Sequence, residues 1–155
     1  MILNNKIIGL QIEFEDEIIK EFEKIALKFY PNEIGGYLMG YYTDDKTKAV
    51  VVKQILSTNF ENSPTSFKHI VDENLKETFV RIFDEEKIHY LGEWHTHPNS
   101  NSNYSLTDFK ALKKIVENKD SNIENPILLI IGFDKKGIRD YSFNVFFNNK
   151  LYKYE

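Results

Sequence analysis

Apolar residues recur at the spacing of an amphipathic helix in three parts of the chain, residues 15–30, 72–87 and 105–118. In the first part, the expected buried face consists of Ile18, Ile19, Phe22, Ile25, Ala26 and Phe29. In the second part it consists of Leu75, Phe79, Ile82 and Phe83, and in the third of Leu106, Phe109, Leu112, Ile115 and Val116. Pro31 is expected to end the first helix, because proline disfavours the helical conformation in the residue before it.

Shorter runs of β-branched and aromatic residues predict strands between these helices. The expected strands cover residues 7–14, 34–42, 49–56, 66–70, 88–94, 127–133, 139–147 and 150–154. Residues 127–133 are almost wholly apolar, which is typical of a central strand buried on both faces. Residues 59–64 and 99–103 are expected to be loops. Because strands and helices alternate, the sequence predicts a mixed α/β (α+β) fold, with a single domain over residues 1–155.

The composition narrows the class of protein. Apolar residues make up 41% of the 155 residues and charged residues 28%, which is ordinary for a folded domain. With 24 acidic and 20 basic side chains the net charge is −4, so no general surface for nucleic acid is expected. No apolar run is long enough to span a bilayer, and residues 1–6 lack the apolar region of a signal peptide. We therefore expect a cytoplasmic protein with no membrane partner.

The chain has no cysteine, so any metal must be held by His, Asp or Glu. His95 and His97 are two residues apart near the end of a predicted strand, so their side chains are expected on one face. Asp108 lies in the first turn of the third predicted helix, and the intervening loop is long enough to bring it back to both histidines. Two His and one Asp would leave a fourth coordination position open, which is typical of a catalytic zinc site.

These residues also have ordinary structural interpretations. The two histidines could be hydrogen-bonded residues at the edge of a loop, and Ser105 with Asp108 has a spacing close to that of a helix capping box. A hydrolytic metal site further requires a base, for which Glu33 is the candidate. Glu33 is followed by glycines at 35 and 36, which would allow another backbone or a substrate to approach closely. The alternative is a solvated turn followed by a β-bulge.

Together these residues resemble the motif of the JAMM metalloproteases, also called the JAB or MPN domain family. That motif consists of an upstream Glu, then His-x-His-Pro, six residues, Ser, two residues and Asp. At these spacings the chain has Glu33, His95-Thr96-His97-Pro98, Ser105 and Asp108. The resemblance covers about residues 10–147 and implies a curved mixed β-sheet flanked by helices.

The resemblance also implies a role for each motif residue. His95, His97 and Asp108 would bind Zn²⁺. Glu33 would take a proton from the attacking water and pass it to the leaving amine, and Ser105 would help to stabilise the oxyanion. The implied enzyme is a zinc isopeptidase or peptidase that hydrolyses an amide bond.

Details of the motif narrow the branch of the family. Residues 92–98 look like those of stand-alone bacterial JAB proteins, which accompany E1- and E2-like enzymes, including antiphage systems of the CBASS type. Thr96 stands where the RadC-type branch usually has Asn. The resemblance thus implies that the chain removes a ubiquitin-like or conjugated protein at its C-terminal tail. Processing of a sulfur-carrier protein's tail and a non-catalytic MPN scaffold stay open as alternatives.

Other residues near the motif have separate assignments. Glu93 has the strand parity of the two motif histidines and is either a hydrogen-bond acceptor for one of them or an exposed or salt-bridged residue on the sheet face. Trp94 has the opposite parity and is expected in the core or in the wall of a groove, and His69 and His89 are assigned to structure. Residues 66–70 lie where relatives present an edge to substrate, so a tail could add there as a strand. A plain loop or an internal strand is the alternative.

Overall fold

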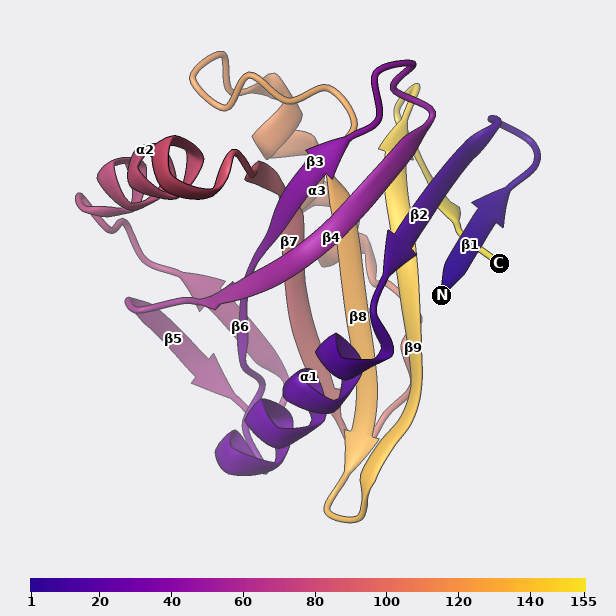
Figure 1. Ribbon diagram of the computed structural model, residues 1–155. Helices are drawn as coiled ribbons and strands as arrows, with labels where there is room; N and C mark the ends of the chain where they lie inside the picture. Colours follow the sequence, from indigo (N-terminus) through magenta and orange to yellow (C-terminus); the bar gives the residue numbers. More distant parts are fainter.

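The computed structural model describes all 155 residues and shows an eight-stranded sheet, a separate hairpin and three helices (Figure 1). The strand order in the sheet is β1-β2-β4-β3-β7-β8-β9-β10. These strands are β1 Ile2–Asn5, β2 Leu10–Phe14, β3 Gly35–Tyr42, β4 Lys48–Leu56, β7 His89–Pro98, β8 Ile127–Asp134, β9 Gly137–Phe147 and β10 Lys150–Lys153. The hairpin is β5 Phe60–Ser63 with β6 Ser66–His69, and the helices are α1 Asp16–Phe29, α2 Leu75–Glu86 and α3 Leu106–Glu117. The sheet is mixed, since β2 pairs with β4 and β7 with β8 in parallel, and the predicted fold class is confirmed.

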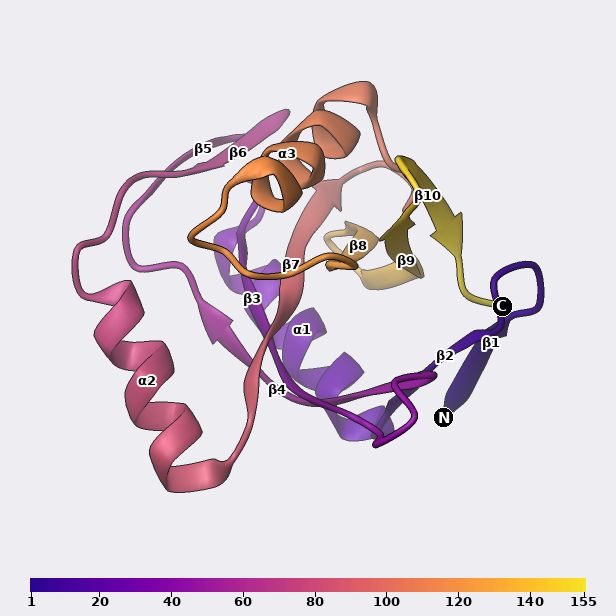
Figure 2. The ribbon, with the colours of Figure 1, turned by 90° about the horizontal axis from the view of Figure 1, so that it is seen from above.

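The sheet curves until its two edges meet at the chain ends. Asn4 in β1 and Glu155 exchange two backbone hydrogen bonds of 2.7 Å each, and the Asn5 side chain donates to the carbonyl of Lys153. The N- and C-termini accordingly lie close together (Figure 2). The predicted final edge strand, β10, therefore lies at a seam that almost closes the sheet into a barrel.

Helix α1 packs inside the curve of the sheet and forms the main core with it (Figure 2). Its buried residues Ile18, Phe22 and Ala26 belong to the predicted apolar face. The Phe22 ring meets the ring of Trp94 on β7 edge-on, with their centroids 4.8 Å apart. Trp94 is fully buried in this core, as its strand parity predicts.

Helices α2 and α3 lie on the opposite face of the sheet from α1. Leu112 of α3 packs against Leu128 and Ile130 of β8, whereas Ile82 of α2 packs against Tyr37 of β3. The alternate residues of β8 belong to the core around α1, so this strand is buried on both faces as predicted. Between α2 and α3, neither helix covers this face of β7 with an apolar cluster.

Several predicted elements differ from the structure; for example, the helix predicted from residue 72 begins at Leu75. Residues 7–9 form a turn between β1 and β2 and are not part of a strand, because the Asn5 side chain accepts hydrogen bonds from the N–H groups of Ile7 and Ile8. The predicted loop over residues 59–64 contains β5, which pairs with β6. The strand predicted to end at Trp94 continues to Pro98, since β8 pairs with it along this whole length.

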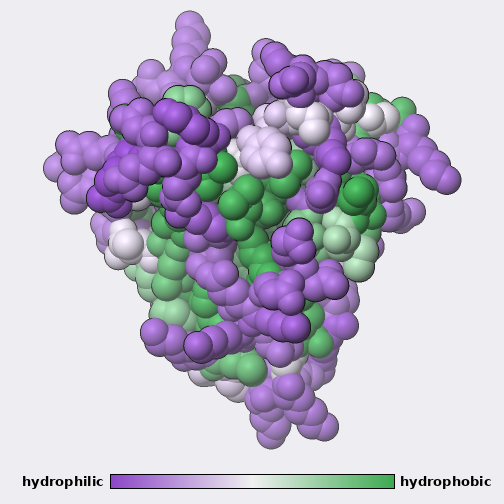
Figure 3. Space-filling view, viewed as in Figure 1, coloured by the Kyte–Doolittle hydropathy of each residue, from purple (hydrophilic) through white to green (hydrophobic).

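Two residues predicted to be buried are exposed. Leu106 is 67% exposed because it is the first residue of α3, where the helix has not yet reached the sheet. Phe83 is 48% exposed because α2 packs on the sheet through the neighbouring Ile82, and the Lys87 ammonium lies 5.6 Å from the centre of the Phe83 ring. On the face seen in Figure 1 the surface is mostly hydrophilic, with apolar residues showing between α1 and α2 (Figure 3). None of the three helices has the length and apolar character needed to cross a membrane.

Candidate active site

Strand β7 presents different side chains to the two faces of the sheet. Trp94 and Thr96 are fully buried, whereas Glu93, His95 and His97 are partly accessible and alternate with them. This alternation follows from the two-residue repeat of a strand. Because Trp94 faces α1, the two motif histidines lie on the opposite face of the sheet, which carries α2 and α3. Figure 2 shows β7 running from beside α2 to beneath α3.

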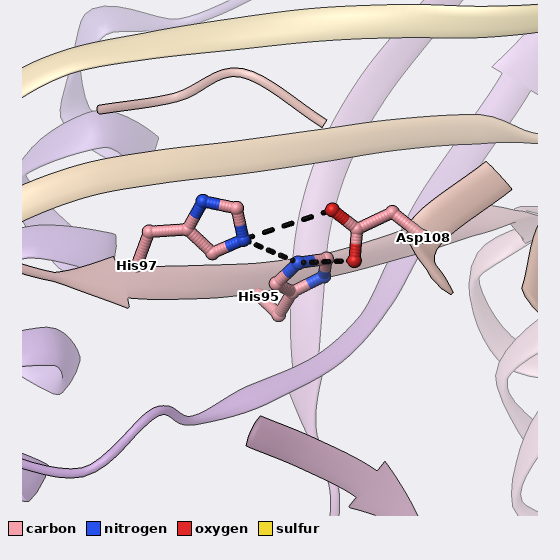
Figure 4. A group of neighbouring side chains, drawn as sticks. All are labelled: His95, His97 and Asp108. Atoms are coloured by element: carbon pink, nitrogen blue, oxygen red, sulfur yellow. Dashed lines mark hydrogen bonds and ion pairs between the residues drawn. The ribbon is translucent and has the colours of Figure 1, made fainter. Parts of the chain in front are cut away.

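Three potential metal ligands converge on that face (Figure 4). His95 Nε2 lies 3.1 Å from His97 Nε2 and 3.1 Å from Oδ1 of Asp108. His97 Nε2 lies 3.7 Å from Oδ2 of Asp108. Two donors that each lie about 2.1 Å from a tetrahedral zinc ion are about 3.4 Å apart. The observed separations therefore fit a single tetrahedral ion, and imidazole with carboxylate is a donor set that suits zinc.

Ser105 and Asp108 form the predicted capping box at the start of α3. The Asp108 N–H donates to Ser105 Oγ over 3.1 Å, and the Ser105 N–H donates to Asp108 Oδ2 over 2.7 Å. This box fixes the carboxylate whose other oxygen faces His95. Because the Ser105 hydroxyl acts as an acceptor in the box, its own hydrogen is still free to be donated. Ser105 can therefore cap α3 and still have a hydroxyl hydrogen to donate to an oxyanion.

The protonation states of these groups follow from their surroundings. Burial by itself would raise the pKa of Asp108, but the hydrogen bond and charge of His95 and the N–H of Ser105 lower this pKa to about 2. Burial would lower the pKa of His95, but Asp108 raises it overall. Burial and the charge of His95 lower the pKa of His97. At neutral pH Asp108 is thus ionised and His97 neutral, which are the forms that bind a metal.

Glu33 precedes β3 and is only 8% exposed, so the interpretation as a solvated turn residue is wrong. Burial raises the pKa of this carboxyl to about 7, although the charge of His95 opposes the shift; the charge of Asp108 adds to it. A carboxyl group with that pKa can both accept and release a proton near neutral pH. The structure thus places a buried carboxyl group within electrostatic reach of His95 and Asp108, two of the three potential metal ligands.

Thr96 fixes the chain beside Glu33. The Ile34 N–H donates to Thr96 Oγ1 over 3.0 Å, and the Thr96 N–H donates to the Ile34 carbonyl over 2.9 Å. On the other side, the Glu33 N–H donates to the carbonyl of Ser63 in β5 over 2.9 Å. Sequence reasoning assigned no such role to Thr96. The available signal is its parity, since a hydroxyl on the buried face of a strand needs a partner.

Gly35 brings the β5–β6 hairpin close to the site. It pairs with His95 across the β3–β7 ladder. A Cβ atom at Gly35 would lie 2.8 Å from a ring carbon of Phe67 on β6 and 3.0 Å from the Cβ of His95. The close approach predicted for this glycine is therefore present, and the approaching group belongs to the chain itself. The register irregularities of β3 fall instead at residues 38–40, so no bulge lies at residues 35–36.

Glu93 contacts His69 and not a motif histidine. Glu93 Oε2 lies 3.4 Å from His69 Nε2, which agrees with the salt-bridged interpretation of Glu93. His69 Nδ1 lies 3.1 Å from the Tyr37 hydroxyl and 3.0 Å from the Ser57 hydroxyl, and its ring stacks on that of Tyr37. His89 Nδ1 lies 3.1 Å from the carbonyl of the next residue. Both histidines thus have the structural surroundings that the sequence predicts.

Comparison with known proteins identifies the family. Residues 15–144, most of the chain, match the sequence model for prokaryotic homologues of the JAB domain. The chain belongs to this JAB-domain family. The resemblance inferred from the JAMM motif is thereby confirmed.

Two curated relatives support a hydrolytic role for this JAB domain. A CD-NTase/cGAS isopeptidase from Enterobacter hormaechei subsp. hoffmannii is 26% identical over 142 residues, which cover 86% of this chain and 74% of that protein. The probable metalloprotease y4qB from Sinorhizobium fredii is 24% identical over 121 residues, which cover 75% and 72%. Together with the His95, His97 and Asp108 group, these names indicate a metal-dependent hydrolase of the JAB type.

Solved structures share the fold of this JAB domain. A protein from Desulfitobacterium hafniense has a TM-score of 0.67 with 20% identity, covering 92% of this chain and 88% of that one. A protein from Salinibacter ruber has a TM-score of 0.62 with 15% identity and the same coverage of each chain. At these identities the two likenesses show the fold alone.

Proposed function

We propose that this JAB domain is a zinc-dependent isopeptidase or peptidase that hydrolyses an amide bond at the C-terminal tail of a ubiquitin-like or conjugated protein. The observation that carries the proposal is the convergence of His95, His97 and Asp108 at tetrahedral spacing, with the buried Glu33 in electrostatic reach. A zinc ion held by these ligands would polarise the amide carbonyl and make the attacking water more acidic.

The remaining chemistry is assigned to residues of the chain. Glu33 accepts a proton from water as the new carbon–oxygen bond forms, and it returns the proton to the amine nitrogen as the carbon–nitrogen bond breaks. Ser105 donates its free hydroxyl hydrogen to the oxyanion of the tetrahedral intermediate. The products are a free carboxylate on the tail and a free amine.

The Enterobacter relative suggests a more specific substrate. Its name describes an isopeptidase of a CD-NTase, or cGAS, and the match covers 86% of the present chain. We infer that the substrate here is also a CD-NTase joined to another protein by an amide bond, within a bacterial antiphage system of the CBASS type. E1- and E2-like enzymes would form the conjugate that this JAB domain removes.

The substrate tail is proposed to bind along β6. This strand pairs with β5 on one side only, so backbone groups on its other side have no strand partner. Phe67 of β6 packs over Gly35, next to His95. An extended tail that added to β6 as a third strand would make backbone hydrogen bonds independent of its sequence. It would also lie beside the metal ligands.

The first test is the metal content of purified protein by mass spectrometry. We expect about one zinc ion per wild-type chain and its loss in the double variant His95→Ala/His97→Ala. His89→Ala is the matched control, because it removes a histidine outside the site. Wild-type protein that binds no stoichiometric metal after zinc is supplied would contradict the proposal.

The second test is cleavage of a CD-NTase whose last residue is joined by a peptide bond to green fluorescent protein. We expect zinc-loaded wild-type protein to separate the two parts and the double histidine variant to leave them joined. Cleavage only of a sulfur-carrier protein with an extended C-terminus would favour the sulfur-transfer alternative. Tight binding without cleavage of either probe would favour the scaffold.

A further inference from the structure

The imidazole of His97 is oriented by the loop over residues 99–104 that joins β7 to α3. His97 Nδ1 lies 3.0 Å from the carbonyl oxygen of Asn101. A carbonyl oxygen can only accept a hydrogen bond, so Nδ1 carries the proton. The lone pair of the neutral ring is then on Nε2, the atom that faces His95 and Asp108. The position of the Asn101 carbonyl therefore favours the tautomer and the ring orientation in which His97 Nε2 can act as a ligand.

The next residue, Ser102, anchors this loop to β9. Ser102 is 3% exposed, and all of its polar groups have partners. Its N–H and its hydroxyl both donate to Oδ2 of Asp140, over 3.1 Å and 2.6 Å. Its carbonyl accepts a hydrogen bond of 2.6 Å from the hydroxyl of Ser142. Asp140 and Ser142 are two residues apart on β9 and so lie on the same face.

Strand β8 has a glycine, Gly132, at the point where the loop over residues 99–104 packs against it. Gly132 of β8 pairs with Asp140 across the β8–β9 ladder. A Cβ atom at Gly132 would lie 2.4 Å from Oδ1 of Asp140, 2.7 Å from the Ser100 carbonyl oxygen and 2.8 Å from the carbonyl carbon of Asn101. The loop thus rests on the one residue type without a side chain, and Asp140 is held between this glycine and Ser102.

We propose that Asp140 is a positioning residue for the metal centre. By holding Ser102 it fixes the adjacent Asn101 carbonyl, and through that carbonyl it keeps His97 in the tautomer and orientation that binds metal. The motif residues do not include Asp140, and sequence reasoning assigned it no role. This role of Asp140 rests on the proposed function, because it assumes that a metal binds at His97. The effect of Asp140 on the tautomer of His97 does not require a bound metal. Ser142 supports the same loop from the neighbouring position.

The test compares Asp140→Ala with Asp140→Asn, which keeps one oxygen that can accept from Ser102. Asp134→Asn is the control, because Asp134 lies on the same hairpin but pairs with Arg139 at 2.9 Å. The first readout is the nitrogen chemical shifts of the His97 ring in zinc-free, ¹⁵N-labelled protein. The second is the zinc dissociation constant, from competition with a chromophoric chelator. Circular dichroism checks that each variant is folded.

We expect Asp140→Ala to convert His97 from one tautomer to a mixture and to weaken zinc binding by about 10- to 100-fold. Asp140→Asn should keep the Nδ1–H tautomer and most of the affinity. If Asp140→Ala does not fold, Gly132→Ala serves instead, since it displaces the same loop. Wild-type ring shifts in a folded loop variant, or an equal loss of affinity in Asp134→Asn, would overturn the inference. Absence of zinc binding by wild type would overturn the proposed function, while the ring shifts would still decide the role of Asp140.

Discussion

The two faces of strand β7 differ in what their side chains contact. On one face, Trp94 packs against Phe22 of α1 in the fully enclosed core. On the other, His95 and His97 are partly accessible and face Asp108. The core face is held by apolar burial, which tolerates little change in volume. The site face holds two imidazoles and a carboxylate close together and largely away from water. This arrangement lowers the free energy of unfolding unless a metal ion binds these groups.

This difference predicts that changes on the two faces have separable consequences. Substitutions on the core face should lower the free energy of unfolding, whereas those on the site face should remove metal binding or turnover from a folded protein. Thr96 is the exception, because it lies on the core face and yet fixes the chain beside Glu33.

Glu33→Gln should lower the rate of amide hydrolysis by at least about 1,000-fold, because it removes the proton acceptor. Zinc content should stay at the wild-type level, since Glu33 is not among the three converging ligands. The rate is measured on the fluorescent fusion and the zinc by mass spectrometry. Glu61→Gln, an exposed residue of β5, is the control and should leave the rate unchanged. Wild-type turnover by Glu33→Gln would show that another group transfers the proton.

Trp94→Ala should destabilise the protein by about 3–5 kcal/mol, because it leaves a large cavity in the core around α1. His95→Ala, on the adjacent position but the opposite face, should change the stability of zinc-free protein much less. Urea unfolding of zinc-free samples measures both values. Equal losses of stability from the two substitutions would mean that the faces are not separable.

Glu33 should also make the stability of zinc-free protein depend on pH. Its folded pKa of about 7 lies above the ordinary value of 4.5, so the folded state binds its proton more tightly than the unfolded chain does. The resulting stability is fully present below pH 4.5 and is lost as the pH rises through 7. Glu33→Gln removes this loss, so its free energy of unfolding relative to wild type should be on the order of 3 kcal/mol higher at pH 8 than at pH 4.5. A difference that is the same at both pH values would contradict the burial argument.

A structural feature can be predicted from this sequence when the residues that determine it are only a few positions apart. The parity of Trp94 and the capping box at Ser105 depend on residues a few positions apart, and both were predicted correctly. Strand β1 and the hairpin strand β5 were missed, because each is only four residues long and contains polar residues. Besides its pairing with β2, β1 is held by two backbone hydrogen bonds to Glu155 at the far end of the chain.

The same distinction applies within the site. Motif spacing indicated His95, His97 and Asp108, and the structure brings them together. The support for this group comes from segments that are remote in sequence. Asp140 reaches Ser102 across 38 positions, and Thr96 reaches Ile34 across 62. No local pattern in a single sequence encodes such pairings, because they depend on strand order and register.

Thr96→Val gives the smallest and most specific test of the separation between the faces. Valine has nearly the same shape, but without the hydroxyl the N–H of Ile34 loses a buried partner, which should cost about 1–2 kcal/mol in stability. Because Ile34 follows Glu33, the turnover of zinc-loaded protein should also fall, while zinc affinity stays near the wild-type value. Thr96→Ser keeps the hydroxyl and should restore turnover even though it loses a buried methyl group. If Thr96→Ser is as slow as Thr96→Val, packing of the methyl group and not the hydrogen bond to Ile34 determines the position of Glu33.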